Sequence, residues 1–216
     1  MRGGGLWGMC RRSAADLTYL PETFMTATIS RSSAILGAAR TLAAKLLLAI
    51  PIDRAALTQA MTESAGGSDA AGAWTQRESF EALEVALAMA IPELVGRMDA
   101  EAAVRTLEAL AKELPTHTVR SEDQIAFQQF STPPALACLA VHLARLGSED
   151  VFLEPSAGTG IIAALAEGGV KQCLLNELEP TRSELLEGLF PGSSVYRHDG
   201  AKLPALLSGT VRPSVI

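Results

Sequence analysis

Apolar residues in the first half of the chain recur at the three- and four-residue spacing typical of helices. Residues 32–62 predict one or two helices broken at Pro51, with Asp53 capping the second. A further helix is predicted over 99–114, where Pro115 ends it. We therefore expect little defined structure over 1–31, followed by helices.

A helix starting at Gln76 is predicted to be amphipathic and to stop near Pro92 or Gly96. Its apolar positions are Phe80, Leu83, Val85, Leu87 and Ala90, flanked by Glu78, Glu81 and Glu84. Just before it, Trp74 is expected to anchor the core rather than to stack on a base. The region 32–115 is thus predicted to be all-helical and to serve as a scaffold or a partner-packing surface rather than to carry chemistry.

The pattern changes after residue 116 to short apolar runs that alternate with helical segments. Strands are predicted at 150–154, 172–177 and 194–197, with a last fragment at 214–216. Helices are predicted from Thr132-Pro133-Pro134 to about Leu146, at 160–167, at 180–189 and loosely at 201–207. Such alternation indicates an α/β domain over 116–216, with a parallel sheet, right-handed crossovers and ligands at the carboxyl ends of the strands.

The most informative stretch of this domain is Glu154-Pro155-Ser156-Ala157-Gly158-Thr159-Gly160, between a predicted strand and a predicted helix. Gly158 and Gly160 allow positive φ angles and a close approach of the backbone to a ligand, and the next helix presents unpaired N–H groups. The acid-Pro-Ser-Ala start is foreign to a dinucleotide fingerprint, and the Lys-Ser/Thr of a phosphate loop is missing. The stretch therefore predicts a nucleotide-like pocket of another kind.

This stretch resembles motif I of S-adenosylmethionine-dependent methyltransferases, in the acid-Pro-x-x-Gly-x-Gly form of the N6-adenine class. Three further matches follow the family order: Phe130-Ser131-Thr132-Pro133 is similar to its Phe-x-Thr-Pro motif, Leu174 to Pro180 to its second strand with a terminal acid, and Val195 to Gly200 to its third strand with an Asp. Residues 120–216, and 70–95 more loosely, resemble the methyltransferase half of bacterial and phage proteins of the strawberry notch type, in which a helicase follows.

The resemblance implies a Rossmann-like methyltransferase sheet and a set of S-adenosylmethionine contacts. Glu154 would orient the turn or receive the methionine ammonium, and the rest of the loop would lie against the cofactor. Glu177 would accept the ribose hydroxyls. Glu179 is the alternative for this contact, or else it caps the next helix. Asp199 would meet the adenine amine, and the Gly200 N–H would face a ring nitrogen.

The methionine end of the cofactor would contact Thr132, together with Phe130 and Pro133. Thr-Pro-Pro is also an ordinary helix start, and Asp-Gly at 199–200 is also an ordinary turn. The cofactor-binding set that the resemblance implies is Phe130, Thr132, Pro133, Glu154, Pro155, Ser156, Ala157, Gly158, Gly160, Glu177, Asp199 and Gly200.

The family's catalytic motif, Asn/Asp/Ser-Pro-Pro-Tyr/Phe after the fourth strand, does not occur in these 216 residues. We expect the sheet to be truncated within its fourth strand, at Val215-Ile216, and we assign no catalytic residue. The first interpretation is the S-adenosylmethionine-binding part of a DNA adenine-N6 methyltransferase-like protein. The alternatives are an RNA or protein-glutamine methyltransferase, and a non-catalytic accessory module that docks a helicase.

The formal net charge of −6 and the pI near 5.1 argue against this chain holding a long duplex alone. The resemblance implies that DNA binds the full-length protein, in which a helicase domain would follow, and the charge predicts that this chain binds DNA weakly at most. Cys10, Cys138 and Cys173 show no metal or disulfide spacing, which favours a reducing cytoplasm. The apolar segment 34–50 contains Arg40 and Lys45, so no membrane span is expected.

Overall fold

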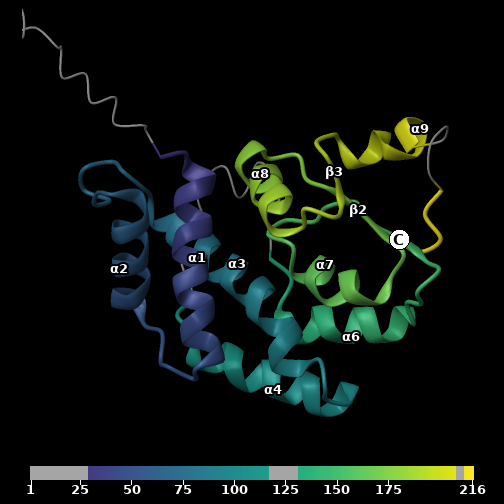
Figure 1. Cartoon of the computed structure of the whole chain (residues 1–216), viewed down its shortest axis with the longest axis horizontal. Coiled ribbons are helices and arrows are strands. Elements are labelled where there is room, and N and C mark those ends of the chain that lie inside the picture. The colour runs from purple at the N-terminus through teal and green to yellow at the C-terminus, as the bar shows by residue number, and fades with distance from the viewer. Residues whose placement is uncertain (1–28, 117–130, 208–211) are drawn as a thin grey trace, which may run out of the picture.

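The computed structural model describes residues 29–116, 131–207 and 212–216 (Figure 1). Four helices come first, and a small parallel sheet with its own helices follows. The predicted contact Phe130 lies outside the described residues. The expected α/β architecture with a preceding helical region is confirmed at this level.

The N-terminal helices are α1 (Arg31–Leu47), α2 (Arg54–Ala65), α3 (Gln76–Val95) and α4 (Ala100–Glu113). Each begins at a polar residue whose side chain accepts a hydrogen bond from the third residue beyond it: Ser30, Asp53, Thr75 and Asp99. At α3 this is a full capping box, in which Glu78 also accepts the Thr75 N–H. The predicted break at Pro51 and the predicted cap at Asp53 are confirmed.

Helix α3 runs between α1 and α7 and is buried on nearly every side (Figure 1). It continues through Pro92 to Val95. The prediction of an amphipathic helix with flanking acids is therefore wrong for Glu81, which is only 4% exposed, because the sheet domain covers the side that the pattern assigned to solvent. Trp74 is a core residue, as expected, and its Nε1–H donates to the Gly67 carbonyl at 3.0 Å.

The second half contains α6 (Pro134–Ala144), α7 (Ile161–Ala166), α8 (Pro180–Leu189) and α9 (Leu203–Leu207), with 3-10 turns at Glu167–Gly169 and Gly200–Lys202. Its strands are β1 (Val151–Glu154), β2 (Gln172–Asn176) and β3 (Ser194–Tyr196). Helix α6 ends two residues before the predicted Leu146, where Arg145 adopts a left-handed conformation with φ of 51°. The strand–helix alternation is otherwise as predicted.

The sheet is parallel, in the order β1-β2-β3, with Phe152 opposite Cys173 and Leu175 opposite Val195. Val215 forms a parallel bridge to Phe152 on the other side of β1, and its carbonyl accepts the Leu153 N–H at 2.9 Å. The order of the chain across the sheet thus reverses at β1. In open α/β sheets, ligands bind beside the carboxyl ends of the strands at such a reversal.

A single large core joins the helical region to one face of the sheet. Phe152, Cys173 and Leu175 belong to it, together with apolar residues of α7, α8 and the first four helices. The opposite face of the sheet packs on α9 through Leu153 and Leu174. Helix α1 touches α8 so closely that a Cβ on Gly188 would lie 2.7 Å from Leu36. The helices of 32–115 are therefore packed directly on the sheet domain and position part of its site.

Candidate functional site

A cavity of about 400 Å³ lies between α3, the end of α4, the start of α6 and the loop that joins β1 to α7. This volume falls in the range of small-molecule sites. Six of the predicted cofactor contacts line it: Thr132, Pro133, Glu154, Ser156, Ala157 and Gly158. Helix α3 contributes Phe80, Leu83, Glu84 and Leu87, and α8 contributes Arg182.

The two glycines of the β1–α7 loop both have positive φ, 57° at Gly158 and 89° at Gly160, but they have different structural roles. A Cβ on Gly160 would lie 2.5 Å from the Phe190 ring, so this glycine allows α7 to pack against α8. A Cβ on Gly158 would meet nothing closer than Arg182 Nη1, at 4.0 Å. Gly158 therefore faces the cavity, while Gly160 faces the core.

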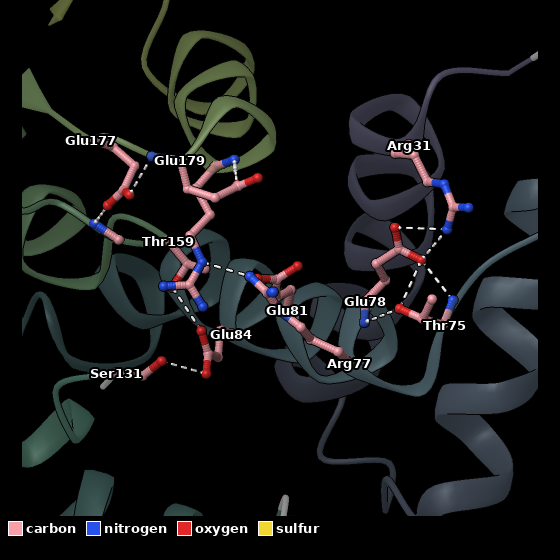
Figure 2. A network of polar contacts seen from close by, with 12 residues as sticks. Arg31, Thr75, Arg77, Glu78, Glu81, Glu84, Ser131, Thr159, Glu177 and Glu179 are labelled. Atoms are coloured by element: carbon pink, nitrogen blue, oxygen red, sulfur yellow. Dashed lines mark hydrogen bonds and ion pairs between the residues drawn. The ribbon is translucent and has the colours of Figure 1, made fainter. Parts of the chain in front are cut away.

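Glu177, immediately after β2, fixes this loop in place. Its carboxylate is 9% exposed and accepts the Gly158 N–H through Oε2 and the Glu179 N–H through Oε1, both at 2.9 Å (Figure 2). Glu179 caps α8 by accepting the Arg182 N–H at 2.7 Å. The reading of Glu179 as a helix cap is thus confirmed, and Glu177 is the acid that touches the loop.

Asn176, the last residue of β2, joins the carboxyl ends of all three strands. Its amide nitrogen donates to the carbonyls of Pro155 at 3.0 Å and His198 at 2.9 Å, and its Oδ1 accepts the His198 N–H at 3.0 Å. The side chain is 2% exposed. This buried amide holds the loops after β1 and β3 against the end of β2.

The remaining predicted contacts among the described residues do not line the cavity. Asp199 is exposed and accepts the Ala201 N–H at 3.1 Å. This hydrogen bond agrees with the alternative interpretation of Asp199-Gly200 as an ordinary turn. Gly200 packs near the Pro155 carbonyl. Pro155, Gly160, Glu177, Asp199 and Gly200 do not line the cavity. Glu177, Asp199 and Gly200 follow the ends of β2 and β3 and form a rim beside the cavity, whereas Gly160 faces the core.

Sequence reasoning missed a charged cluster that α3 brings to the cavity (Figure 2). Glu84 accepts hydrogen bonds from the Ser131 hydroxyl and, at 3.1 Å, from the Thr159 hydroxyl. Glu81 accepts from Arg182 Nε at 2.9 Å and pairs with Arg77 at 3.1 Å. A signal was present in the pattern: Glu84 occupies the i+4 place of the apolar stripe formed by Phe80, Leu83 and Leu87.

Two carboxyls in the cavity wall hold their protons more tightly than usual. Burial raises the pKa of Glu84, an effect that the Ser131 hydrogen bond, the charge of Arg182 and the Thr159 hydrogen bond only partly oppose. Burial likewise raises the pKa of Glu154 to about 7, against the opposing effect of a hydrogen bond from the Ser156 N–H. A bound cation would favour the ionised form of both groups.

Among the residues that the structure describes, no cluster of three or more His, Cys, Asp or Glu side chains could hold a metal ion. Within the same ranges, no helix is both long and apolar enough to cross a bilayer. Comparison with protein-family models, curated proteins and solved structures gave no match to this chain. The functional argument therefore depends on the site itself.

Proposed function

We propose that this chain is the S-adenosylmethionine-binding part of a DNA adenine-N6 methyltransferase-like protein, with a Rossmann-like sheet. One observation carries the proposal. The acid-Pro-x-x-Gly-x-Gly loop follows β1 at the point where the strand order reverses, and its Gly158 faces a cavity that Thr132 and Pro133 also line. Residues of two separate family-like motifs thus meet at one pocket, although they lie more than twenty positions apart in the sequence.

In the proposed complex the methionine end occupies the cavity, and the adenosine lies along the rim formed by Glu177 and Asp199. Each oxygen of the Glu177 carboxylate accepts one main-chain N–H, so further lone pairs remain for the ribose hydroxyls. Asp199 uses Oδ1 for the Ala201 N–H, which leaves its second oxygen for the adenine amine. Gly158, with no side chain, lets the cofactor approach the loop backbone.

Methyl transfer needs little more from this part of the protein than alignment, because the sulfonium is already a strong electrophile. The 216 residues contain no Asn/Asp/Ser-Pro-Pro-Tyr/Phe, so the group that would polarise the target amine is not assigned to any of them. The net charge of −6 disfavours duplex binding by this chain, so the proposal includes a DNA-binding surface in another part of a longer protein, with a helicase domain as the proposed neighbour.

Isothermal titration with S-adenosylmethionine tests the proposal. We expect saturable one-to-one binding that S-adenosylhomocysteine competes away and ATP does not. No binding at millimolar cofactor would refute it. A longer form that carries the family's catalytic motif should then transfer tritiated methyl groups to adenine in DNA, whereas transfer only to RNA or protein would favour the alternative substrates.

A further inference from the structure

Glu84 links the two motif-bearing segments of the cavity from outside the sheet domain. It comes from α3, and its two carboxylate oxygens each accept one hydroxyl: Ser131, next to Thr132, and Thr159, next to Gly158. Helix α3 packs on α7, so the carboxylate is held at the cavity wall by helix packing as well as by hydrogen bonds. This position makes Glu84 a structural neighbour of any ligand in the cavity.

The charges around Glu84 are unevenly paired. Glu81 forms ion pairs with two guanidinium groups, Arg182 at 2.9 Å and Arg77 at 3.1 Å, whereas the charge of Arg182 acts on Glu84 without an ion pair between them. Glu84 forms no ion pair with any cation in the described ranges 29–116, 131–207 and 212–216. A carboxylate in a partly desolvated wall is stabilised by a cation that it can hydrogen-bond. The cavity therefore offers a place for a positively charged group beside Glu84.

Arg182 supplies the complementary charge in the same wall. Its Nε is committed to Glu81, while Nη1 lies on the cavity side, 4.0 Å from the position that a Cβ on Gly158 would take. A guanidinium can donate from its remaining N–H groups to a carboxylate.

We propose that Glu84 and Arg182 form a seat for a zwitterionic α-amino-acid group, in which Glu84 accepts the ammonium and Arg182 donates to the carboxylate. The inference rests on the proposed cofactor and specifies how its methionine end binds. It gives the helical region a direct part in ligand specificity. Glu84 is here a binding residue, and no chemical step is assigned to it.

Three ligands distinguish the Glu84–ammonium contact from the Arg182–carboxylate contact. They are S-adenosylmethionine, its decarboxylated form, and 5′-deoxy-5′-methylthioadenosine, which lacks the whole amino-acid end. Glu84→Gln keeps an oxygen for Ser131 and Thr159 but removes the charge. We expect it to weaken S-adenosylmethionine binding by about 10- to 100-fold, the usual effect of losing a charged hydrogen-bond partner, and to leave methylthioadenosine binding unchanged. Glu93→Gln, at an exposed position of α3, is the matched control and should change neither.

Arg182→Gln leaves Glu81 paired with Arg77. It should weaken S-adenosylmethionine binding and leave the binding of the decarboxylated form unchanged.

Equal affinity of Glu84→Gln and wild type for S-adenosylmethionine would overturn the seat but not the proposed function. Equal loss of all three ligands in Glu84→Gln would overturn the seat by showing that Glu84 acts only on the fold. Failure of the wild type to bind any of the three would overturn the proposed function and the seat with it.

Discussion

The Glu177 carboxylate accepts the Gly158 N–H at 2.9 Å, so the acid at the end of β2 fixes the glycine loop that follows β1. The bond joins positions nineteen residues apart and holds the one loop glycine that faces the cavity. The same Glu177 side chain therefore positions the loop and would contact the ribose, so a change at Glu177 affects both.

Glu177→Ala should weaken S-adenosylmethionine binding by about 10- to 100-fold, since losing a charged hydrogen-bond partner costs roughly 1.5–3 kcal/mol. Glu179→Ala should have a smaller effect, because Glu179 caps α8 and its removal acts on the helix. Titration calorimetry of both variants checks the order. A larger loss in Glu179→Ala would move the ribose contact to Glu179.

Gly160→Ala should destabilise the fold more than Gly158→Ala. Both positions have positive φ, which costs an alanine about 1–2 kcal/mol. Only at residue 160 would the new Cβ also collide with the Phe190 ring, at 2.5 Å, and overpacking adds about 1–3 kcal/mol. Denaturant unfolding measures both free energies. Equal losses would show that α7 and α8 do not pack as described.

Asn176→Ala should lower the free energy of unfolding by about 2–4 kcal/mol, because it leaves the Pro155 and His198 carbonyls and the His198 N–H without their partner. Gln172→Ala is the control in the same strand, where the side chain makes one long bond of 3.4 Å to Ser194. Its effect should be well under 1 kcal/mol. Similar melting temperatures for Asn176→Ala and wild type would contradict the role assigned to this amide.

Glu154→Gln should stabilise the unliganded protein in a pH-dependent way. The folded-state pKa of about 7 lies above the ordinary 4.5, so the folded protein holds this proton more tightly than the unfolded chain does. The wild type therefore loses stability as pH rises from 4.5 to 7, and the variant lacks this loss. The advantage of the variant should grow over that window to at most about 3 kcal/mol. A difference that is flat with pH would contradict the burial of Glu154.

Local signals in the sequence predicted much of the fold. Polar residues before apolar stripes marked the caps, as at Asp53, and short apolar runs marked all three strands. The β1–α7 loop was recognisable because positive φ and close packing both demand glycine. These features depend on neighbours along the chain, which a single sequence displays.

The environment of α3 could not be predicted in the same way. Helical periodicity identifies an apolar face, but it does not reveal that a later part of the chain covers the other sides of the helix. Glu81 is buried because Arg182, 101 positions later, provides its counter-charge. Glu84 lies in the cavity because α7 packs on α3. Both depend on tertiary contacts between segments distant in sequence, so the sequence alone predicts these acids only as the flanks of an amphipathic helix.

Amide chemical shifts during a titration with S-adenosylmethionine test the central claim most directly, because they report both binding and its place. We predict saturable shifts at Gly158 and Thr159, with smaller shifts at Gly200, and none in α2, which does not line the cavity. Saturable shifts confined to α2 or other elements away from the β1–α7 loop, or no shifts at millimolar cofactor, would contradict the account.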